Sequence, residues 1–154
     1  MSGRPLNILL VEDNPDHAEL VRRNLESFSA ASHLNHVEDG EAAIHFIFGQ
    51  GEFADRTKFP EPDLVLLDLH LPRLDGLEVL RLVKSHPILR RIPIVILTTS
   101  DAERDVAMAY EYHANSFVTK PVNFQQLSQI ISDLGFHWLV ITPNPPSVTV
   151  RITP

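Results

Sequence analysis

The sequence predicts an α/β domain built on a doubly wound parallel sheet of five strands, and three observations lead to this class. Short apolar runs alternate along the chain with segments of helical periodicity. Several of these runs are apolar at every position, which is typical of strands buried on both faces. Residues that favour turns and helix ends separate the runs. At 154 residues, the chain is long enough for one such domain.

Five runs are expected to form the strands. The first, third and fourth are continuously apolar, whereas the second is weaker and the fifth is short. They cover residues 8–11, 33–37, 64–67, 94–97 and 116–118. Their ends are followed in chain order by a small set of polar side chains: Glu12 and Asp13, then Asp68, Thr98 and Lys120.

Five helices are expected between and after these strands. Asn14 suits the N-cap of the first helix, with Pro15 at its first position, and Asn123 and Gly135 suit the two ends of the last. The helices cover about residues 15–29, 42–48, 76–85, 101–112 and 124–134. The polar segment 49–61 combines Gly, Pro and mixed charge, so it is expected to be a loop.

The composition excludes several classes of protein. A net charge of −7 argues against a surface that follows nucleic-acid phosphates. The chain has no cysteine, which excludes disulfides and zinc–sulfur sites, and its eight histidines lack the paired spacing of a zinc site. No segment approaches the roughly 18 apolar residues that a membrane span needs. We therefore expect a cytoplasmic protein that contacts neither nucleic acid nor membrane directly.

The residues at the strand ends form the candidate site. Because the strands of a parallel sheet share one direction, Glu12, Asp13, Asp68, Thr98 and Lys120 are expected at one edge. Three carboxylates in one pocket repel one another unless a cation joins them. A hard divalent ion such as Mg²⁺ takes oxygen ligands, while an ammonium and a hydroxyl suit phosphoryl oxygens. We therefore expect a metal and a phosphoryl group around Asp68.

Each of these residues also has an ordinary structural explanation when it is taken alone. Asp68 could cap a helix or turn, and Glu12 and Asp13 could favour the positive end of the following helix. Thr98 could be a β-branched strand residue, and Lys120 could be a surface lysine. Their joint position at the ends of four separate strands favours the site.

Five stretches together resemble the receiver domain of two-component response regulators. They are residues 9–14 (LLVEDN), 66–72 (LLDLHLP), 75–76 (DG), 97–98 (LT) and 120–121 (KP). The resemblance covers about residues 6–135, which we take as the receiver domain, and leaves 136–154 as a C-terminal extension. It implies a flavodoxin-like fold. It also implies that Asp68 accepts a phosphoryl group from a sensor histidine kinase.

The resemblance implies roles for the other site residues as well. Asp13 and Asp68, with the backbone carbonyl of His70, would bind Mg²⁺, and Glu12 would act through a bound water. Thr98 and Lys120 would contact the phosphoryl oxygens.

The same resemblance implies a switch that pairs Thr98 with an aromatic residue on the fifth strand. Phe117, three residues before Lys120, occupies that place without the hydroxyl of the commoner Tyr. Phosphorylation adds about −1.5 to −2 charge and three acceptors. Thr98 could move to meet these acceptors, which would open room for Phe117.

Two features resemble a narrower group, the small stand-alone regulators partnered with bacterial and cyanobacterial phytochromes. These are the long loop at 49–61 and the chain end soon after the last helix. A phytochrome is therefore the expected kinase, and no DNA-binding output domain is expected. The sequence does not indicate the downstream partner.

The C-terminal extension carries a pattern of its own. Val148, Val150 and Ile152 alternate with polar residues, which is the period of a half-buried strand. The segment is either a disordered terminus or an arm that docks on a second copy to form a homodimer. The family resemblance implies a second possible dimer surface, formed by the last two helices and the fifth strand.

Two other functions are weighed against a phospho-acceptor. An Mg²⁺-dependent phosphatase would also use an aspartyl nucleophile, but the chain has no cap domain, and His70 stands where a second acid is needed. A degenerate receiver acting as a scaffold would not need the complete set of site residues. We therefore expect a signalling protein that catalyses only its own phosphotransfer and dephosphorylation.

Overall fold

The fold is a single five-stranded parallel sheet, seen in a computed structural model that describes residues 6–26, 32–99, 103–120 and 123–135. The strand order is β2-β1-β3-β4-β5. The strands are β1 (Leu6–Val11), β2 (Ser32–Val37), β3 (Leu64–Asp68), β4 (Ile94–Thr98) and β5 (Ser116–Thr119). The order reverses between β1 and β3, as in a doubly wound sheet. The predicted fold class is confirmed.

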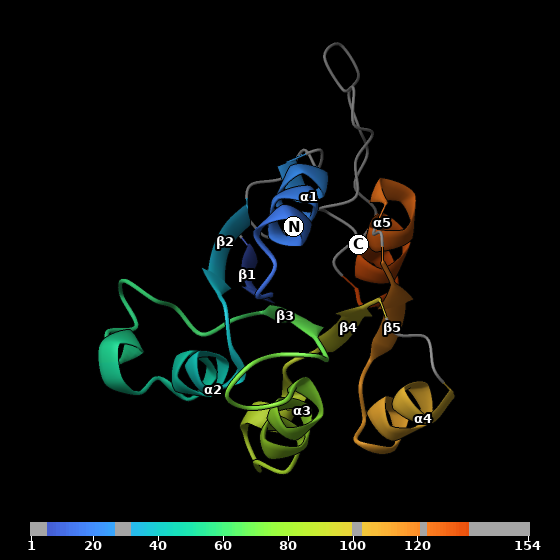
Figure 1. The fold of residues 1–154 in the computed structure, drawn as a ribbon. Helices are drawn as coiled ribbons and strands as arrows, with labels where there is room; N and C mark the ends of the chain where they lie inside the picture. Colours follow the sequence, from blue (N-terminus) through green and yellow to red (C-terminus); the bar gives the residue numbers. More distant parts are fainter. Residues whose placement is uncertain (1–5, 27–31, 100–102, 121–122, 136–154) are drawn as a thin grey trace.

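In the described part of the chain, five α-helices cover the two faces of the sheet (Figure 1). On one face lie α1 (Pro15–Glu26) and α5 (Phe124–Asp133). On the other lie α2 (Gly40–Phe48), α3 (Gly76–Lys84) and α4 (Glu103–Glu111). A short 3-10 helix, η2 (Leu89–Arg91), precedes β4. Within the described ranges, no helix is long and apolar enough to cross a membrane.

Alternating residues of the central strands supply two separate apolar clusters. Leu9 and Leu67 belong to the cluster under α2, α3 and α4, whereas Leu10 and Leu66 belong to the cluster under α1 and α5. Each of these leucines is at most 1% exposed. Full burial of such a side chain contributes about 1.5–3 kcal/mol, so the continuously apolar runs stabilise both layers at once.

The register of the central strands determines which residues meet at the carboxyl edge. Leu10 pairs with Leu66, and Val11 pairs with Leu67. One step further along, Glu12 therefore lies beside Asp68. These two carboxylates flank the point where the strand order reverses, which is where open α/β sheets form their ligand crevice.

Asparagine and aspartate side chains begin the helices. The Asn14 side-chain oxygen accepts from the backbone N–H groups of Asp16 and His17 at 2.9 and 3.2 Å. Asn123 accepts from Gln126 at 2.7 Å, so both predicted N-caps are confirmed.

The start of α2 differs from the sequence prediction. The Asp39 side chain accepts from the Ala42 N–H at 2.7 Å. Because Asp39 is the N-cap, the helix begins at Gly40, two residues before the predicted start.

The segment 49–61, predicted to be a loop, contains a 3-10 helix, η1 (Gly51–Phe53), and packs on α2. The Phe53 ring lies 5.0 Å from that of Phe46 and 5.1 Å from that of Phe59, measured between ring centroids. These aromatic contacts form a small extension of the core beyond the edge of the sheet.

Arg56 fastens this segment to the end of α2. Its guanidinium donates to the carbonyls of Phe46 and Ile47, both at 2.8 Å, and to that of Phe59 at 3.0 Å. The first two carbonyls lie in the last turn of α2, where the intrahelical donors run out. That of Phe46 also accepts from the Gly49 N–H at 3.2 Å. The arginine thus caps the helix and holds the loop in one contact.

Three sequence predictions lie outside the described residues. They concern the end of the first helix beyond Glu26, the start of the fourth at residues 101–102, and the C-terminal extension 136–154.

Gly76 lets α3 approach the end of β3 closely. Its N–H donates to the Leu69 carbonyl at 2.8 Å. A Cβ placed on Gly76 would lie 2.3 Å from the Asp68 carbonyl oxygen and 2.6 Å from the Leu69 Cα. Both neighbours are backbone atoms, so the helix or the strand end would have to move.

We expect Gly76→Ala to lower the free energy of unfolding by about 1–3 kcal/mol, because the added methyl overpacks this contact. Urea unfolding followed by circular dichroism measures the change. Gly51→Ala serves as a control, because its Cβ would meet no atom within 4 Å and only its φ of +59° is unfavourable. A smaller loss for Gly76→Ala than for Gly51→Ala would show that the strand end yields easily.

Candidate functional site

Three carboxylates lie together at the carboxyl edge of the sheet. Glu12 and Asp13 follow β1, and Asp68 ends β3. One carboxylate oxygen from each lies within 4.8 Å of the others. Glu12 is 1% exposed and Asp68 is 6% exposed, whereas Asp13 faces solvent. The structure thus brings together the three acids that the sequence predicted for this edge.

Lys120 supplies a cation to this cluster from the end of β5. Its ammonium forms a hydrogen-bonded ion pair with Glu12 Oε1 and lies 3.5 Å from Asp68 Oδ2. The lysine side chain is 6% exposed. Because β5 lies two strands from β3, the side chain reaches past β4 to make these contacts. The predicted lysine therefore joins the predicted acids.

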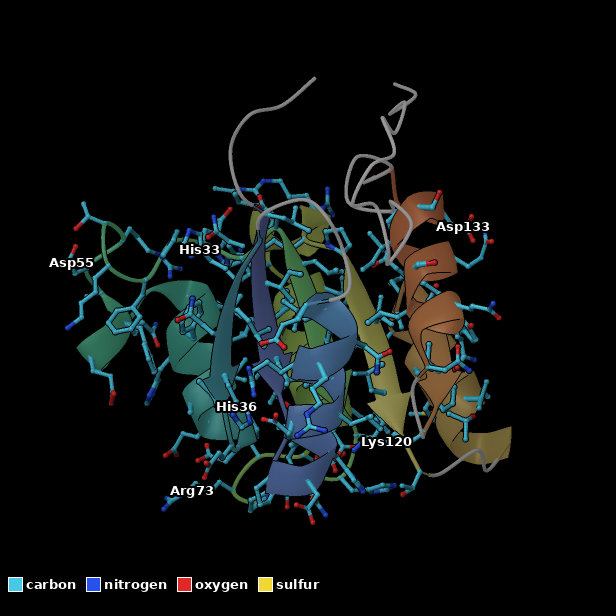
Figure 2. All side chains as sticks on the ribbon, turned by 90° about the horizontal axis from the view of Figure 1, so that it is seen from above. His33, His36, Asp55, Arg73, Lys120 and Asp133 are labelled. Carbon is cyan, nitrogen blue, oxygen red and sulfur yellow. The ribbon has the colours of Figure 1, made fainter. Side chains whose placement is uncertain are left out.

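Figure 2 shows the end of the molecule to which this site belongs. Lys120, His36 and Arg73 lie toward one end of the sheet, and His33 and Asp133 lie toward the other. Lys120 is thus at the end where the strands finish, as the parallel arrangement requires.

Glu12 is held firmly by its neighbours. Its backbone N–H donates to the Val37 carbonyl at 3.0 Å, and its own carbonyl accepts from His36 Nε2 at 2.7 Å. Its side-chain Oε2 accepts from the Asn14 N–H at 3.1 Å, while Oε1 binds Lys120. A buried carboxylate is expensive unless it is paired and hydrogen-bonded, and here both oxygens have partners.

The electrostatic environment disfavours the charged form of Asp68. Burial raises the pKa of this carboxyl above its ordinary value, and the nearby charge of Glu12 raises it further. The Lys120 ammonium and a hydrogen bond from the His70 backbone N–H act in the opposite direction without cancelling the rise in pKa. The cluster therefore carries more negative charge than one ammonium balances.

His17 also belongs to the site, although the sequence did not identify it. Its Nδ1 lies 3.0 Å from Lys120 Nζ and 4.0 Å from Glu12 Oε2. Its sequence position could have indicated this role, because His17 lies in the first helical turn after Asn14. That N-cap fixes how the turn faces the strand ends.

The remaining predicted residues occupy the expected elements. Thr98 ends β4, and its side chain lies outside what the structure describes. Phe117, on β5, is half-buried against the cluster under α2, α3 and α4. His70 is exposed, and its backbone N–H, which donates to Asp68, is its contact with the site described here. The proposed ligand role of the His70 carbonyl and the pairing of Thr98 with Phe117 stay predictions.

The donor set fits a divalent cation. Glu12, Asp13 and Asp68 offer carboxylate oxygens, which are the ligands that Mg²⁺, Ca²⁺ and Mn²⁺ prefer. The exposure of Asp13 leaves a path for the ion and its waters. A cation here would offset the charge that Lys120 leaves unbalanced.

The comparison with protein families now decides the class. A family model described as the response regulator receiver domain matches residues 8–132. The chain belongs to the response regulator receiver family. As a receiver domain, it is a signalling protein of two-component systems, and the predicted flavodoxin-like fold agrees with this assignment.

Individual relatives share most of this receiver domain's length. Response regulator Rcp1 from Synechocystis sp. is 42% identical over 138 residues, covering 90% of this chain and 92% of that protein. The phosphorylated cyanobacterial phytochrome response regulator RcpA has 40% identity and a TM-score of 0.75, covering 88% of this chain and 95% of its own. The Mn²⁺-bound form of Rcp1 has 40% identity and a TM-score of 0.73, covering 96% and 99%.

These similarities agree with the local geometry. Receiver domains bind a divalent metal at an acidic pocket, and a close relative has been solved with Mn²⁺ bound. In this receiver domain, the buried Glu12 and Asp68 with the exposed Asp13 form such a pocket.

We expect Asp68→Asn to stabilise the metal-free protein near neutral pH by about 0.5–2 kcal/mol. The change removes one buried charge and leaves Glu12 and Lys120 as a balanced pair. Because the pKa of Asp68 is raised on folding, the native state binds more protons than the unfolded state above the usual carboxyl pKa of roughly 3.9. Wild-type stability therefore falls as pH rises through that window, so the advantage of Asn should shrink on acidification.

Urea unfolding with a chelator, at neutral pH and at about pH 4, measures the difference. Asp133→Asn is the control, because it removes an exposed acid on α5. If Asp68→Asn were less stable than the wild type at neutral pH, the attraction of Lys120 would outweigh both burial and repulsion.

Proposed function

We propose that this receiver domain accepts a phosphoryl group on Asp68 from a sensor histidine kinase and signals by a phosphorylation-dependent change of its surface. The observation that carries the proposal is the convergence of Glu12 and Lys120 on this one buried strand-end carboxylate. The likeness to a phosphorylated response regulator supports it.

The chemistry assigns one role to each group. A carboxylate oxygen of Asp68 attacks phosphorus while the phosphorus–nitrogen bond to the kinase histidine breaks, and that imidazole keeps the electron pair and takes up a proton. Lys120 and Thr98 contact the phosphoryl oxygens. The product is an acyl phosphate on Asp68. The chain thus catalyses only its own phosphotransfer and later hydrolysis.

Magnesium is the divalent ion that we propose for the reaction, held by Asp13, Asp68 and the His70 carbonyl, with Glu12 acting through water. When bound, it neutralises the acids and holds a phosphoryl oxygen. A cation beside Asp68 also opposes the rise in its pKa, so the carboxylate is charged when it acts as nucleophile.

The surface change is proposed to run through Thr98 and Phe117. Phe117 is only partly buried where it packs on the core, so it has room to change its packing. A new dianionic group at Asp68 would attract the Thr98 hydroxyl and free the space that Phe117 enters.

We further propose that the kinase is a phytochrome and that the protein acts in the cytoplasm. The support is the 40% identity to a cyanobacterial phytochrome response regulator across most of both chains. The downstream partner is a protein rather than nucleic acid, in keeping with the net charge of −7.

We expect the wild-type protein to form an acid-stable, base-labile phosphoryl adduct with a histidine kinase and Mg²⁺, and Asp68→Asn to form none. Asn is nearly isosteric with Asp but lacks the nucleophilic anion. Transfer of radiolabelled phosphate followed by electrophoresis measures the adduct. Asp133→Asn should be labelled like the wild type, and equal labelling of Asp68→Asn would end the proposal.

We also propose that the protein forms a homodimer and that this dimer depends on the C-terminal extension. Val148, Val150 and Ile152 offer an apolar side that must pair with an edge or an apolar face to be stable. The occupant that we propose is a second copy of the chain, with each extension clasping the other protomer.

Truncation after Thr142 should therefore shift the protein toward monomer in light scattering. Val150→Asp in the full chain should have the same effect, because it places a charge on the apolar side of the arm. Thr149→Asp adds the same charge on the polar side and should leave the mass unchanged. An unchanged mass after truncation would show that the arm does not hold the dimer.

A further inference from the structure

We propose that His17 is a positioning residue that keeps the Lys120 ammonium at the site while a divalent cation takes the carboxylates. The inference deepens the proposed function and rests on it for the phosphorylation step alone. Its geometric basis, the contact between His17 Nδ1 and Lys120 Nζ at 3.0 Å, is independent of that function.

The Lys120 ammonium has three hydrogens and, among the described side chains, three neighbouring acceptors. They are Glu12 Oε1, Asp68 Oδ2 at 3.5 Å and His17 Nδ1 at 3.0 Å. The lysine side chain is 6% exposed, so water has little access to replace a lost partner. Each of the three contacts therefore contributes to where the ammonium lies.

Two of these acceptors are shared with the metal and one is not. Glu12 and Asp68 belong to the acidic cluster that fits a divalent ion. The cation and the ammonium therefore compete for the same two carboxylates. His17 is neutral when its Nδ1 accepts a hydrogen bond, and it lies outside the acidic cluster, so it can keep its contact with Lys120 when the carboxylates turn to the metal.

This competition predicts an effect of His17 on metal affinity. In the metal-free site, loss of the His17 contact leaves Lys120 with two carboxylate partners. In the metal-loaded site, the same loss leaves a buried ammonium with weakened partners, which is more costly. Removing His17 should therefore oppose metal binding.

The position of His17 makes the proposal testable without unfolding the protein. Its side chain is 38% exposed, and its backbone N–H is held by the Asn14 cap whatever the side chain is. The neighbouring Ala18 supplies the buried contact of this turn with the core. Replacing the ring thus removes the contact with Lys120 and leaves the anchoring of α1.

Calorimetric titration with Mg²⁺ tests the proposal in four variants: His17→Leu, His17→Asn, Lys120→Met and the double variant His17→Leu with Lys120→Met. We expect His17→Leu to weaken Mg²⁺ binding about three- to tenfold, the range that a single hydrogen bond supplies. His17→Asn should bind within about twofold of the wild type, because its amide oxygen can accept from Lys120. In the Lys120→Met background, His17→Leu should change nothing.

His45→Leu is the matched control, because it removes an exposed helical histidine from α2. It should leave Mg²⁺ affinity unchanged. Unaltered affinity in His17→Leu would overturn the proposal. So would an equal loss of affinity with and without Lys120, because His17 would then act on the metal by another route.

Phosphorylation gives a second readout at saturating Mg²⁺, with acetyl phosphate as a donor that needs no kinase. His17→Leu should lower the maximal labelling rate and leave the half-saturating donor concentration unchanged, because the ammonium is misplaced rather than lost. His17→Asn should restore the rate, and an unchanged rate in His17→Leu would count against the positioning role. A wild type that takes up no phosphoryl group would defeat the proposed function, while the Mg²⁺ titrations would still decide the role of His17.

Discussion

The ion pair between Lys120 and Glu12 joins the end of β5 to the end of β1 across the carboxyl edge of the sheet. With Asp68 beside it, one ammonium serves two buried carboxylates, and the exposed Asp13 adds a third negative charge. The fold tolerates these buried charges because the apolar clusters on both sides of the sheet contribute more folding free energy than the desolvation of the charges costs. The cluster also keeps a net negative charge, which favours the binding of any cation able to enter.

The parallel sheet allows residues far apart in this chain to form such a cluster. Residues 12 and 120 are 108 positions apart, and only a common strand direction brings them to one edge. The close approach of Gly76 to the Asp68 carbonyl then couples α3 to the same strand end. The Asp68 carboxylate therefore lies next to both the sheet and the helix layer that contains α3, so a chemical change on it can affect both.

The strands, both Asn N-caps and the edge acids with Lys120 were predictable, because each depends on local residue types and the common direction of the strands. The contact of His17 with Lys120 was not, since it depends on how far a side chain from β5 reaches toward α1. The hydrogen bonds of Arg56 could not be predicted from the sequence for another reason. Its acceptors are backbone carbonyls, which every residue carries, so no residue type marks them.

Those bonds have a consequence for how the molecule opens. Because one guanidinium bonds the Phe46 and Ile47 carbonyls in the last turn of α2 and the carbonyl of Phe59, the segment 49–61 cannot detach without taking this donor from the end of the helix. The aromatic rings of Phe53 and Phe59 would lose the Phe46 ring in the same event. The segment 49–61 and α2 thus form one cooperative unit. Their backbone amides should exchange with solvent together, rather than first in the segment and later in the helix.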